Sequence, residues 1–180
     1  MKKLFLITFV VPITDMLMRS VDNSIVSDTL PQTTTSLENW DPKSGNLPDE
    51  AAYTALYNDL KVAIEQKNHT KLGSRLNYES SGMSSLFRIV GKDVSKMETN
   101  VGYKEQFIAA DKAWGDIKTW TTFKLYSSKY TNGYFLAAVD MKKTPDGAQM
   151  LPESERIYIN LFVRTILMSI IITGLCLLLG

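Results

Sequence analysis

The feature that most restricts the fold of this chain is its C-terminal apolar run, IYINLFVRTILMSIIITGLCLLLG, from Ile157 to Gly180. As a helix, these roughly 24 residues would extend about 36 Å at ~1.5 Å per residue, and a bilayer core requires about 20 apolar residues. Arg164 carries the only charge in the run, and apolar residues occupy every face of the expected helix. The run therefore predicts a membrane-spanning helix. The alternative, a core helix of a soluble domain, usually keeps a polar edge.

The composition of the whole chain is that of an ordinary globular protein: 180 residues, 44% hydrophobic, 22% charged, with a formal net charge of +1. This balance gives no reason to expect nucleic acid or an acidic surface as a partner. The apolar residues gather at the two ends of the chain, and the polar middle, residues 21–156, is long enough for one domain with a modest core. The only cysteine, Cys176, lies in the apolar run. A disulfide within the chain is excluded, and we interpret Cys176 as a small apolar filler.

Residues 1–21 form a second apolar segment. Lys2 and Lys3 precede an apolar run over residues 4–13, as in a secretory signal peptide, but no small-x-small cleavage site follows. The apolar residues continue as far as Arg19. We favour a first transmembrane helix over a cleaved signal.

The details of this segment agree with a membrane helix. Pro12 would kink it, which membrane helices tolerate, and Asp15 and Arg19 are spaced to pair across one turn. Under the positive-inside rule, Lys2 and Lys3 keep the N-terminus in the cytoplasm. Both interpretations place the following domain on the non-cytoplasmic side.

Between the two apolar segments, residues 22–47 lack periodicity and are expected to form an extended connection across the membrane surface, with Trp40 docked on the folded domain. Residues 48–156 are expected to form a helical periplasmic domain. Pro48 and two acidic residues open its first helix, which runs to about Gln66. Apolar spacing predicts further helices over residues 72–78, 83–90, 103–114 and 117–126, with Leu86, Phe87, Ile89, Val90, Phe107, Ile108, Ala110, Trp120, Phe123 and Leu125 facing inward.

The end of this domain is less regular. Residues 130–141 are apolar and fit either a helix or a strand, and Thr144-Pro145-Asp146-Gly147 is a strong turn signal for one hairpin. The polar stretch from Pro152 to Arg156 then leads into the terminal helix.

No motif predicts catalysis, a cofactor or a metal ion. The sole histidine, His69, has no second histidine or cysteine at hand and is expected to be a solvated turn residue. Asn68-His69-Thr70 matches a glycosylation sequon, a short and common motif. Asp49 and Glu50 lie in the first turn of a helix, where the helix dipole accounts for them. The aromatic side chains fall on apolar faces and are expected in the core rather than in a ligand cage.

Three sets of residues carry a resemblance to a known family. Arg19-Ser20-Val21-Asp22 ends the first apolar segment, and Val163-Arg164-Thr165 and Cys176-Leu177-Leu178-Leu179-Gly180 lie in the second. In this order they resemble binding-protein-dependent ABC transporter permeases, and most closely the spermidine/putrescine type. The middle is similar to the enlarged periplasmic insert of some bacterial members at the segments Leu47-Pro48-Asp49-Glu50-Ala51, Arg75-Leu76-Asn77-Tyr78-Glu79 and Lys112-Ala113-Trp114-Gly115-Asp116.

The resemblance implies the first part of a MetI-like permease fold: mostly α, with two transmembrane helices, residues 1–21 and 157–180, flanking a mainly helical extracytoplasmic domain. It implies a multi-pass protein of the bacterial inner membrane that forms part of the pathway for a small, polyamine-like solute. The implied partners are membrane lipid, a second permease subunit, a cytoplasmic ATP-binding subunit that hydrolyses ATP, and a periplasmic solute-binding protein. The run ends at Gly180 with no basic flank or polar tail, and the coupling loop for the ATPase is missing, so we expect a fragment of a longer membrane protein. The first helix could be clipped at its start as well.

Two other classes of protein share this layout. A helix, an extracytoplasmic domain and a returning helix also make up bacterial sensor kinases and chemoreceptors, which would continue beyond Gly180 with a basic flank and a polar coiled coil. A secreted enzyme with a C-terminal anchor would need a site signature, and none is found. Arg164 has two interpretations as well: a polar contact between bundle helices or with the pathway, or a side chain that snorkels to the headgroups beside Asn160.

Overall fold

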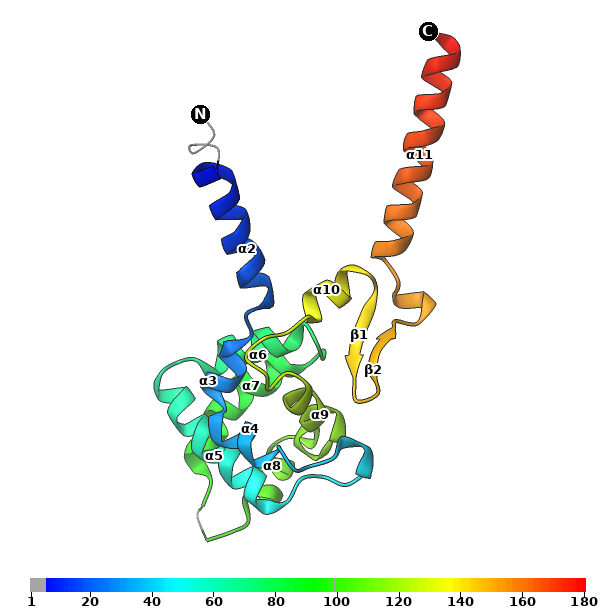
Figure 1. Cartoon of the computed structure of the whole chain (residues 1–180). Helices are drawn as coiled ribbons and strands as arrows, with labels where there is room; N and C mark the ends of the chain where they lie inside the picture. Colours follow the sequence, from blue (N-terminus) through cyan, green and yellow to red (C-terminus); the bar gives the residue numbers. More distant parts are fainter. Residues whose placement is uncertain (1–5, 99) are drawn as a thin grey trace. The chain divides into compact units, whose positions relative to one another are not determined.

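Helices make up most of this protein in a computed structural model that describes residues 6–98 and 100–180, which confirms the expected mostly-α class. The chain divides into two units, Met1–Thr131 and Asn132–Gly180. This differs from the expected boundaries, since residues 22–47 belong to the helical domain and the domain ends at Thr131 rather than Arg156. The helices of the first unit are η1 (Leu6–Val10), α2 (Val11–Val21), α3 (Ser24–Thr29), α4 (Pro31–Ser36), η2 (Pro42–Ser44), α5 (Glu50–Glu65), α6 (His69–Asn77), α7 (Met83–Asp93), η3 (Val94–Lys96), α8 (Tyr103–Ala110), η4 (Lys112–Gly115) and α9 (Ile117–Leu125) (Figure 1).

The N-terminal segment is helical from Leu6 to Val21, with a π-helical turn before α2. Its large apolar side chains between Ile7 and Met18 are exposed, and Arg19 Nε donates to Asp15 Oδ2 at 2.9 Å, which confirms the predicted pairing. Among the described residues, only the C-terminal helix is long and apolar enough to pass as a membrane span. The first transmembrane helix therefore stays a prediction, and Lys2 and Lys3 lie outside the described residues.

The expectation of an extended connection over residues 22–47 is wrong. Two short helices, α3 and α4, form there and pack on α5, because the segment contributes apolar side chains to the core. Val26, Leu30 and Leu37 are fully buried. Trp40 is half-buried against the same core and its Nε1 donates to the carbonyl of Asn46 at 3.0 Å, which confirms its docking on the domain.

Aromatic side chains form the centre of the helical domain, which confirms that they serve the core. Tyr53 of α5 contacts Trp120 of α9, with ring centroids 4.5 Å apart, and its hydroxyl donates to the carbonyl of Trp114 at 2.8 Å. Phe87 of α7 and Phe123 of α9 complete the cluster with edge-on contacts. Such offset rings add to the stability that their buried area provides.

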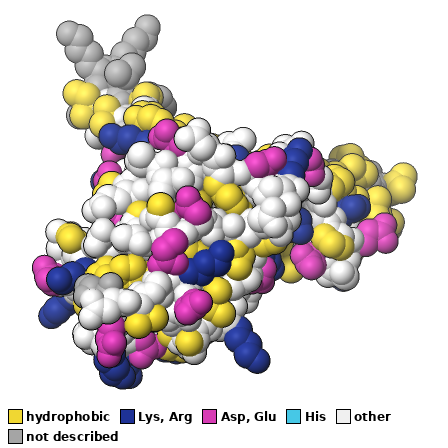
Figure 2. All heavy atoms as spheres, turned by 90° about the horizontal axis from the view of Figure 1, so that it is seen from below, with side chains coloured by type: hydrophobic (Ala, Val, Ile, Leu, Met, Phe, Trp, Pro, Cys, Tyr) yellow, Lys and Arg dark blue, Asp and Glu magenta, His cyan; other side chains and the backbone are white. Residues whose placement is uncertain are grey.

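The predicted helix faces are mostly confirmed. Leu86, Phe87 and Val90 of α7 are buried, whereas Ile89 is 43% exposed, contrary to expectation. The predicted helix 103–114 ends early, at Ala110, which is exposed, and Asp111 begins the separate turn η4 by accepting from the backbone N–H of Ala113. On the face of the molecule that Figure 2 shows, acidic and basic side chains are interspersed.

The chain enters and leaves the helical domain at one place. Asp22 and Tyr130 form an antiparallel bridge, and the N–H of Thr131 donates to the carbonyl of Val21 at 2.9 Å. Asn23 is buried beside them and its Nδ2 donates to the carbonyls of Tyr126, at 2.6 Å, and Ser128, at 3.0 Å. The end of α2 and the segment that follows α9 are thereby fixed side by side.

The second unit contains α10 (Gly133–Ala138), the strands β1 (Met141–Thr144) and β2 (Gly147–Met150), the turn η5 (Glu153–Glu155) and α11 (Tyr158–Leu179). The strands pair antiparallel, with Met141 opposite Met150 and Thr144 opposite Gly147, which confirms the predicted hairpin. Gly147 has a φ of +112°, a conformation that a residue with a side chain rarely adopts. The ambiguous stretch 130–141 is a helix that ends at Ala138 and is followed by a strand.

Candidate functional site

The candidate functional element is the helix α11, because its exposed apolar side chains limit the environments in which it can lie. It has 22 residues and none of them is buried. Leu161, Phe162 and Leu177 are 53%, 67% and 81% exposed. Leaving one such side chain in water rather than burying it costs about 1.5–3 kcal/mol, so transfer of this surface to an apolar environment would be favourable.

The first turn of α11 is capped by the carboxylate of Asp140. Three backbone N–H groups donate to it, from Ile157 at 3.1 Å, Tyr158 at 3.0 Å and Ile159 at 2.6 Å. No residue adjacent to the helix caps it, since the N-cap position is occupied by Ile157. Asp140 lies 17 residues earlier in the chain and is 1% exposed. The backbone N–H groups at a helix start have no partner within the helix, and here Asp140, on the other side of the hairpin, accepts from them.

Electrostatics favour this arrangement. Burial opposes ionisation of the Asp140 carboxyl, but the three backbone donors and the charge of Arg156 outweigh it and hold the pKa of Asp140 below its usual value. The positive end of the helix dipole acts in the same direction. Asp140 also has a φ of +52°, a left-handed conformation that an aspartate tolerates better than most residues.

Backbone contacts tie the same residue to the hairpin. The N–H of Leu151 donates to the carbonyl of Asp140 at 2.8 Å, and Arg156 Nε donates to the carbonyl of Leu151 at 2.6 Å. Asp140 therefore joins the end of α10, the open end of the hairpin and the start of α11. In the sequence, Asp140 is a single carboxylate at the end of an apolar run, and no local pattern marks it as a helix cap.

One side of α11 carries its polar groups. Arg164, Thr165 and Ser169 line a shallow hollow together with Leu161, and Thr165 Oγ1 donates to the carbonyl of Leu161 at 2.8 Å. Arg164 lies in the second turn of the helix and is exposed. In a membrane this side could pack against another helix, or Arg164 could extend to the headgroups. Both interpretations of Arg164 stay open.

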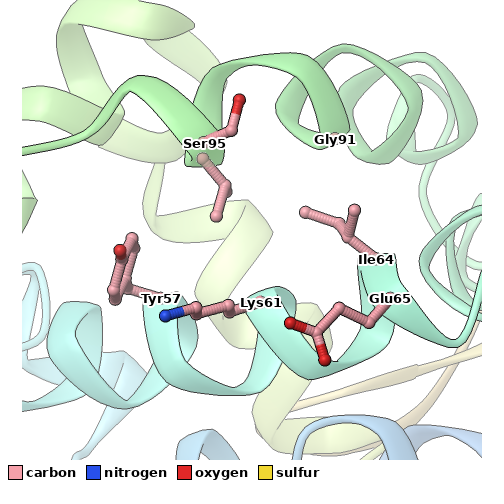
Figure 3. Close-up of a pocket in the computed structure, with 7 residues that line it drawn as sticks. Tyr57, Lys61, Ile64, Glu65, Gly91 and Ser95 are labelled. Atoms are coloured by element: carbon pink, nitrogen blue, oxygen red, sulfur yellow. The ribbon is translucent and has the colours of Figure 1, made fainter.

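The helical domain has a pocket of its own, of about 360 Å³, between α5 and the end of α7 with η3 (Figure 3). Lys61 and Glu65 lie one turn apart along the α5 rim, and Ile64 points from α5 toward the helix that carries Gly91. Tyr57 closes one end and stacks on Tyr103, with ring centroids 4.3 Å apart. The walls combine an apolar floor with one cation and one anion, and they bring together no group of catalytic residues.

The expectation for His69 is wrong. This residue begins α6 rather than lying in a solvated turn, and it is half-buried with its ring against Gly91. Its Nδ1 is buried without a hydrogen-bond partner in the part of the chain that the structure describes. Helix packing draws the ring inward, because α6 and α7 pack closely along their lengths.

The described residues, 6–98 and 100–180, contain no group of three or more His, Cys, Asp or Glu side chains arranged to hold a metal ion. Cys176 is exposed on α11, in line with its place in the apolar run. No family model, curated protein or solved structure matches this chain. The likeness to ABC permeases therefore depends on the sequence motifs alone.

Proposed function

We propose that α11 spans a membrane and that the helical domain, Asp22–Thr131, is held on its non-cytoplasmic side. The observation that carries the proposal is the apolar surface of this 22-residue helix, none of whose residues is buried. At ~1.5 Å per residue the helix extends about 33 Å, close to the ~30 Å of a bilayer core. The cap from Asp140 supports the same placement, because an unsatisfied N–H at the edge of the lipid costs several kcal/mol.

A second span at the N-terminus follows from the same argument. The described part, Leu6–Val21, exposes Phe9, Val11, Ile13, Met16 and Leu17. The bridge between Asp22 and Tyr130 supports this topology, because the chain enters and leaves the domain at one place. A domain attached in this way can be held against one membrane surface by both of its ends.

We further propose that the chain is part of a permease subunit of an ABC importer for a small, polyamine-like solute. Support comes from the ordered motifs around Arg19 and Arg164 and from the layout of helix, domain and helix. Binding to a second permease subunit, a cytoplasmic ATP-binding subunit and a periplasmic solute-binding protein belongs to this proposal. The chain itself has no role in hydrolysis.

A receptor is the second candidate. The paired entry and exit at Asp22 and Tyr130 would also suit an extracytoplasmic sensor domain that transmits a ligand signal through two helices. The pocket beside Lys61 and Glu65 would then be the first place to test for a ligand.

Membrane topology is tested first. With Cys176→Ala as background, Ser81→Cys introduces a thiol at an exposed position of the helical domain. We expect a membrane-impermeant maleimide to label it in intact spheroplasts and carbonate washing to leave the chain in the membrane. Release by carbonate, or labelling only after the cells are broken, would refute the proposed topology.

The choice between permease and receptor needs a different measurement. A permease subunit should co-purify with an ATP-binding subunit whose ATPase rate rises when a solute-binding protein is added. A receptor should co-purify with neither and should continue beyond Gly180 with a polar coiled coil. The second result would exclude the transporter.

A further inference from the structure

The short helix α10 carries exposed apolar side chains. Phe135 and Val139 are 49% and 46% exposed, and Tyr134 is 38% exposed. Phe135 and Val139 are four residues apart, so they lie on the same side of the helix. No charged residue occurs between Asn132 and Val139. Apolar side chains grouped on one exposed helix face are typical of surfaces that contact lipid or another protein.

The cap of α11 fixes the position of α10 along the axis of α11. Asp140 follows Val139 directly, and its carboxylate is within 2.6 to 3.1 Å of the first three N–H groups of α11. The C-terminal end of α10 must therefore lie level with the first turn of α11. Since a helix rises ~1.5 Å per residue, Phe135 is within roughly 10 Å of that level. If α11 spans the bilayer, this level is the headgroup layer, which is about 5–8 Å thick on each side.

The side chains of α10 are of the kind that the headgroup layer accommodates. Tyrosine is enriched there, and phenylalanine anchors helices that lie in the membrane plane about 5–10 Å deep. The first turns of α11 add Tyr158 and Phe162, which are 59% and 67% exposed. A six-residue helix has little stability of its own in water, so contact with lipid would also stabilise its structure.

We infer that α10 is an interfacial anchor whose Phe135 and Val139 contact lipid in the leaflet that α11 enters. The inference depends on the proposed membrane span of α11 and goes beyond it. A span alone fixes the helix across the bilayer and does not require α10 to contact lipid. An anchor beside it also fixes the hairpin and the segment that leads to the helical domain at the membrane surface.

Depth-dependent fluorescence quenching tests the anchor in the full chain. In the Cys176→Ala background, Phe135→Cys is labelled with an environment-sensitive fluorophore and the protein is reconstituted in phosphatidylcholine vesicles. Nitroxide lipids carry the quencher either near the headgroup or near the bilayer centre. Ile170→Cys, at a 65% exposed position in the middle of α11, tests whether α11 lies in the bilayer. Ser81→Cys, at an exposed position of the helical domain, is the control for a label in water. Val139→Cys repeats the test in case the loss of Phe135 disturbs α10.

We expect the label at residue 135 to be quenched more by the shallow nitroxide than by the deep one, with the reverse order at residue 170 and little quenching at residue 81. If residues 135 and 139 behave like residue 81, α10 lies in water and the inference is wrong. A blue-shifted label without lipid quenching would mean that protein covers α10, which also overturns it. A label at residue 170 that no lipid quenches would refute the span itself and, with it, the anchor.

Discussion

Replacing Asp59 tests how the start of α4 is held against α5. Asp59 lies on α5, is 3% exposed, and caps the start of α4 from another helix. Its Oδ2 accepts from the backbone N–H of Thr33 at 2.7 Å and from Thr33 Oγ1 at 2.8 Å, and its Oδ1 accepts a longer bond from the N–H of Gln32 at 3.3 Å. The residue before the helix, Leu30, has no side chain that could do this.

The cost of Asp59→Ala follows from the groups it leaves behind. Thr33 is fully buried, so its N–H and hydroxyl lose their partner without gaining water, at about 1–3 kcal/mol each. Gln32 is exposed, and water replaces its weaker bond. The variant also avoids the burial of a carboxylate, which offsets part of the loss. We expect a net destabilisation of about 3 kcal/mol, or roughly 10 °C in Tm for a domain of this size.

Thermal unfolding of the full chain in detergent micelles measures this effect, with near-ultraviolet circular dichroism following the buried tryptophans. Asp28→Ala is the matched control, because Asp28 is an exposed aspartate on the neighbouring helix α3. We expect the control to change Tm little. Equal Tm values for Asp59→Ala and the wild type would refute the role of Asp59 as the cap of α4.

The pH dependence adds an independent test with Asp59→Asn, which cannot titrate. Burial raises the pKa of Asp59, and the bonds from Thr33 and Gln32 only partly oppose it. A raised pKa contributes stability that is complete below the unfolded value, about pH 4, and is lost as the pH rises through the folded value. The wild type should therefore gain stability relative to Asp59→Asn on acidification from pH 7 toward pH 4. A difference that stays constant would contradict the assignment.

Three other substitutions test the core and the membrane helix. Gly73→Ala would place a methyl group 2.6 Å from Cβ of Phe87, so we expect chemical unfolding to show a loss of about 2 kcal/mol in the free energy of unfolding. Gly174→Ala is the control and should be neutral, because the added methyl group meets nothing within 4 Å. Burial raises the pKa of Tyr53 to about 12. The wild type should therefore lose stability between pH 10 and 12 in an alkaline titration, and Tyr53→Phe should not. Equal losses of stability in the two proteins would refute this. Arg164→Leu should leave membrane insertion intact in a protease-protection assay, and loss of insertion would reject the placement of that end of α11.

Several elements of the fold could be predicted from the sequence, because the spacing of apolar residues and the turn residues define them. The helices α5, α7, α9 and α11 and the hairpin near Gly147 follow from period and turn chemistry and form close to their expected positions, whereas α6 begins at His69 rather than at Leu72. The proposal that α11 spans a membrane also comes from its length and composition, both of which can be read from the sequence.

The segment over residues 22–47 shows where this reasoning fails. Its two helices have only six residues each, so neither displays a repeat that could be recognised. They form because Val26, Leu30 and Leu37 are buried against α5, a tertiary contact that local propensity does not contain. The position of His69 was missed for a similar reason, because only the approach of α7 at Gly91 takes its ring out of water.

Helix capping shows most clearly which features can be recognised from local sequence and which depend on tertiary contacts. Four aspartates accept from the backbone of the turn or helix that they directly precede, a pattern visible in the sequence: Asp41, Asp49, Asp111 and Asp116. Three carboxylates instead cap helices that are distant in the chain: Glu50 accepts from the first N–H groups of α8, Asp59 from α4 and Asp140 from α11.

The distant caps have a consequence that local caps lack. A local cap stabilises one helix end, whereas a distant cap exists only when two elements are in place together, so it couples their folding. Asp140 is the case that bears on function, because its partners are the first N–H groups of the proposed membrane helix. Loss of this carboxylate would leave three N–H groups without partners at the edge of the bilayer and would also free the end of α10. The start of the span, the hairpin and the proposed interfacial anchor should therefore lose their order together rather than one by one.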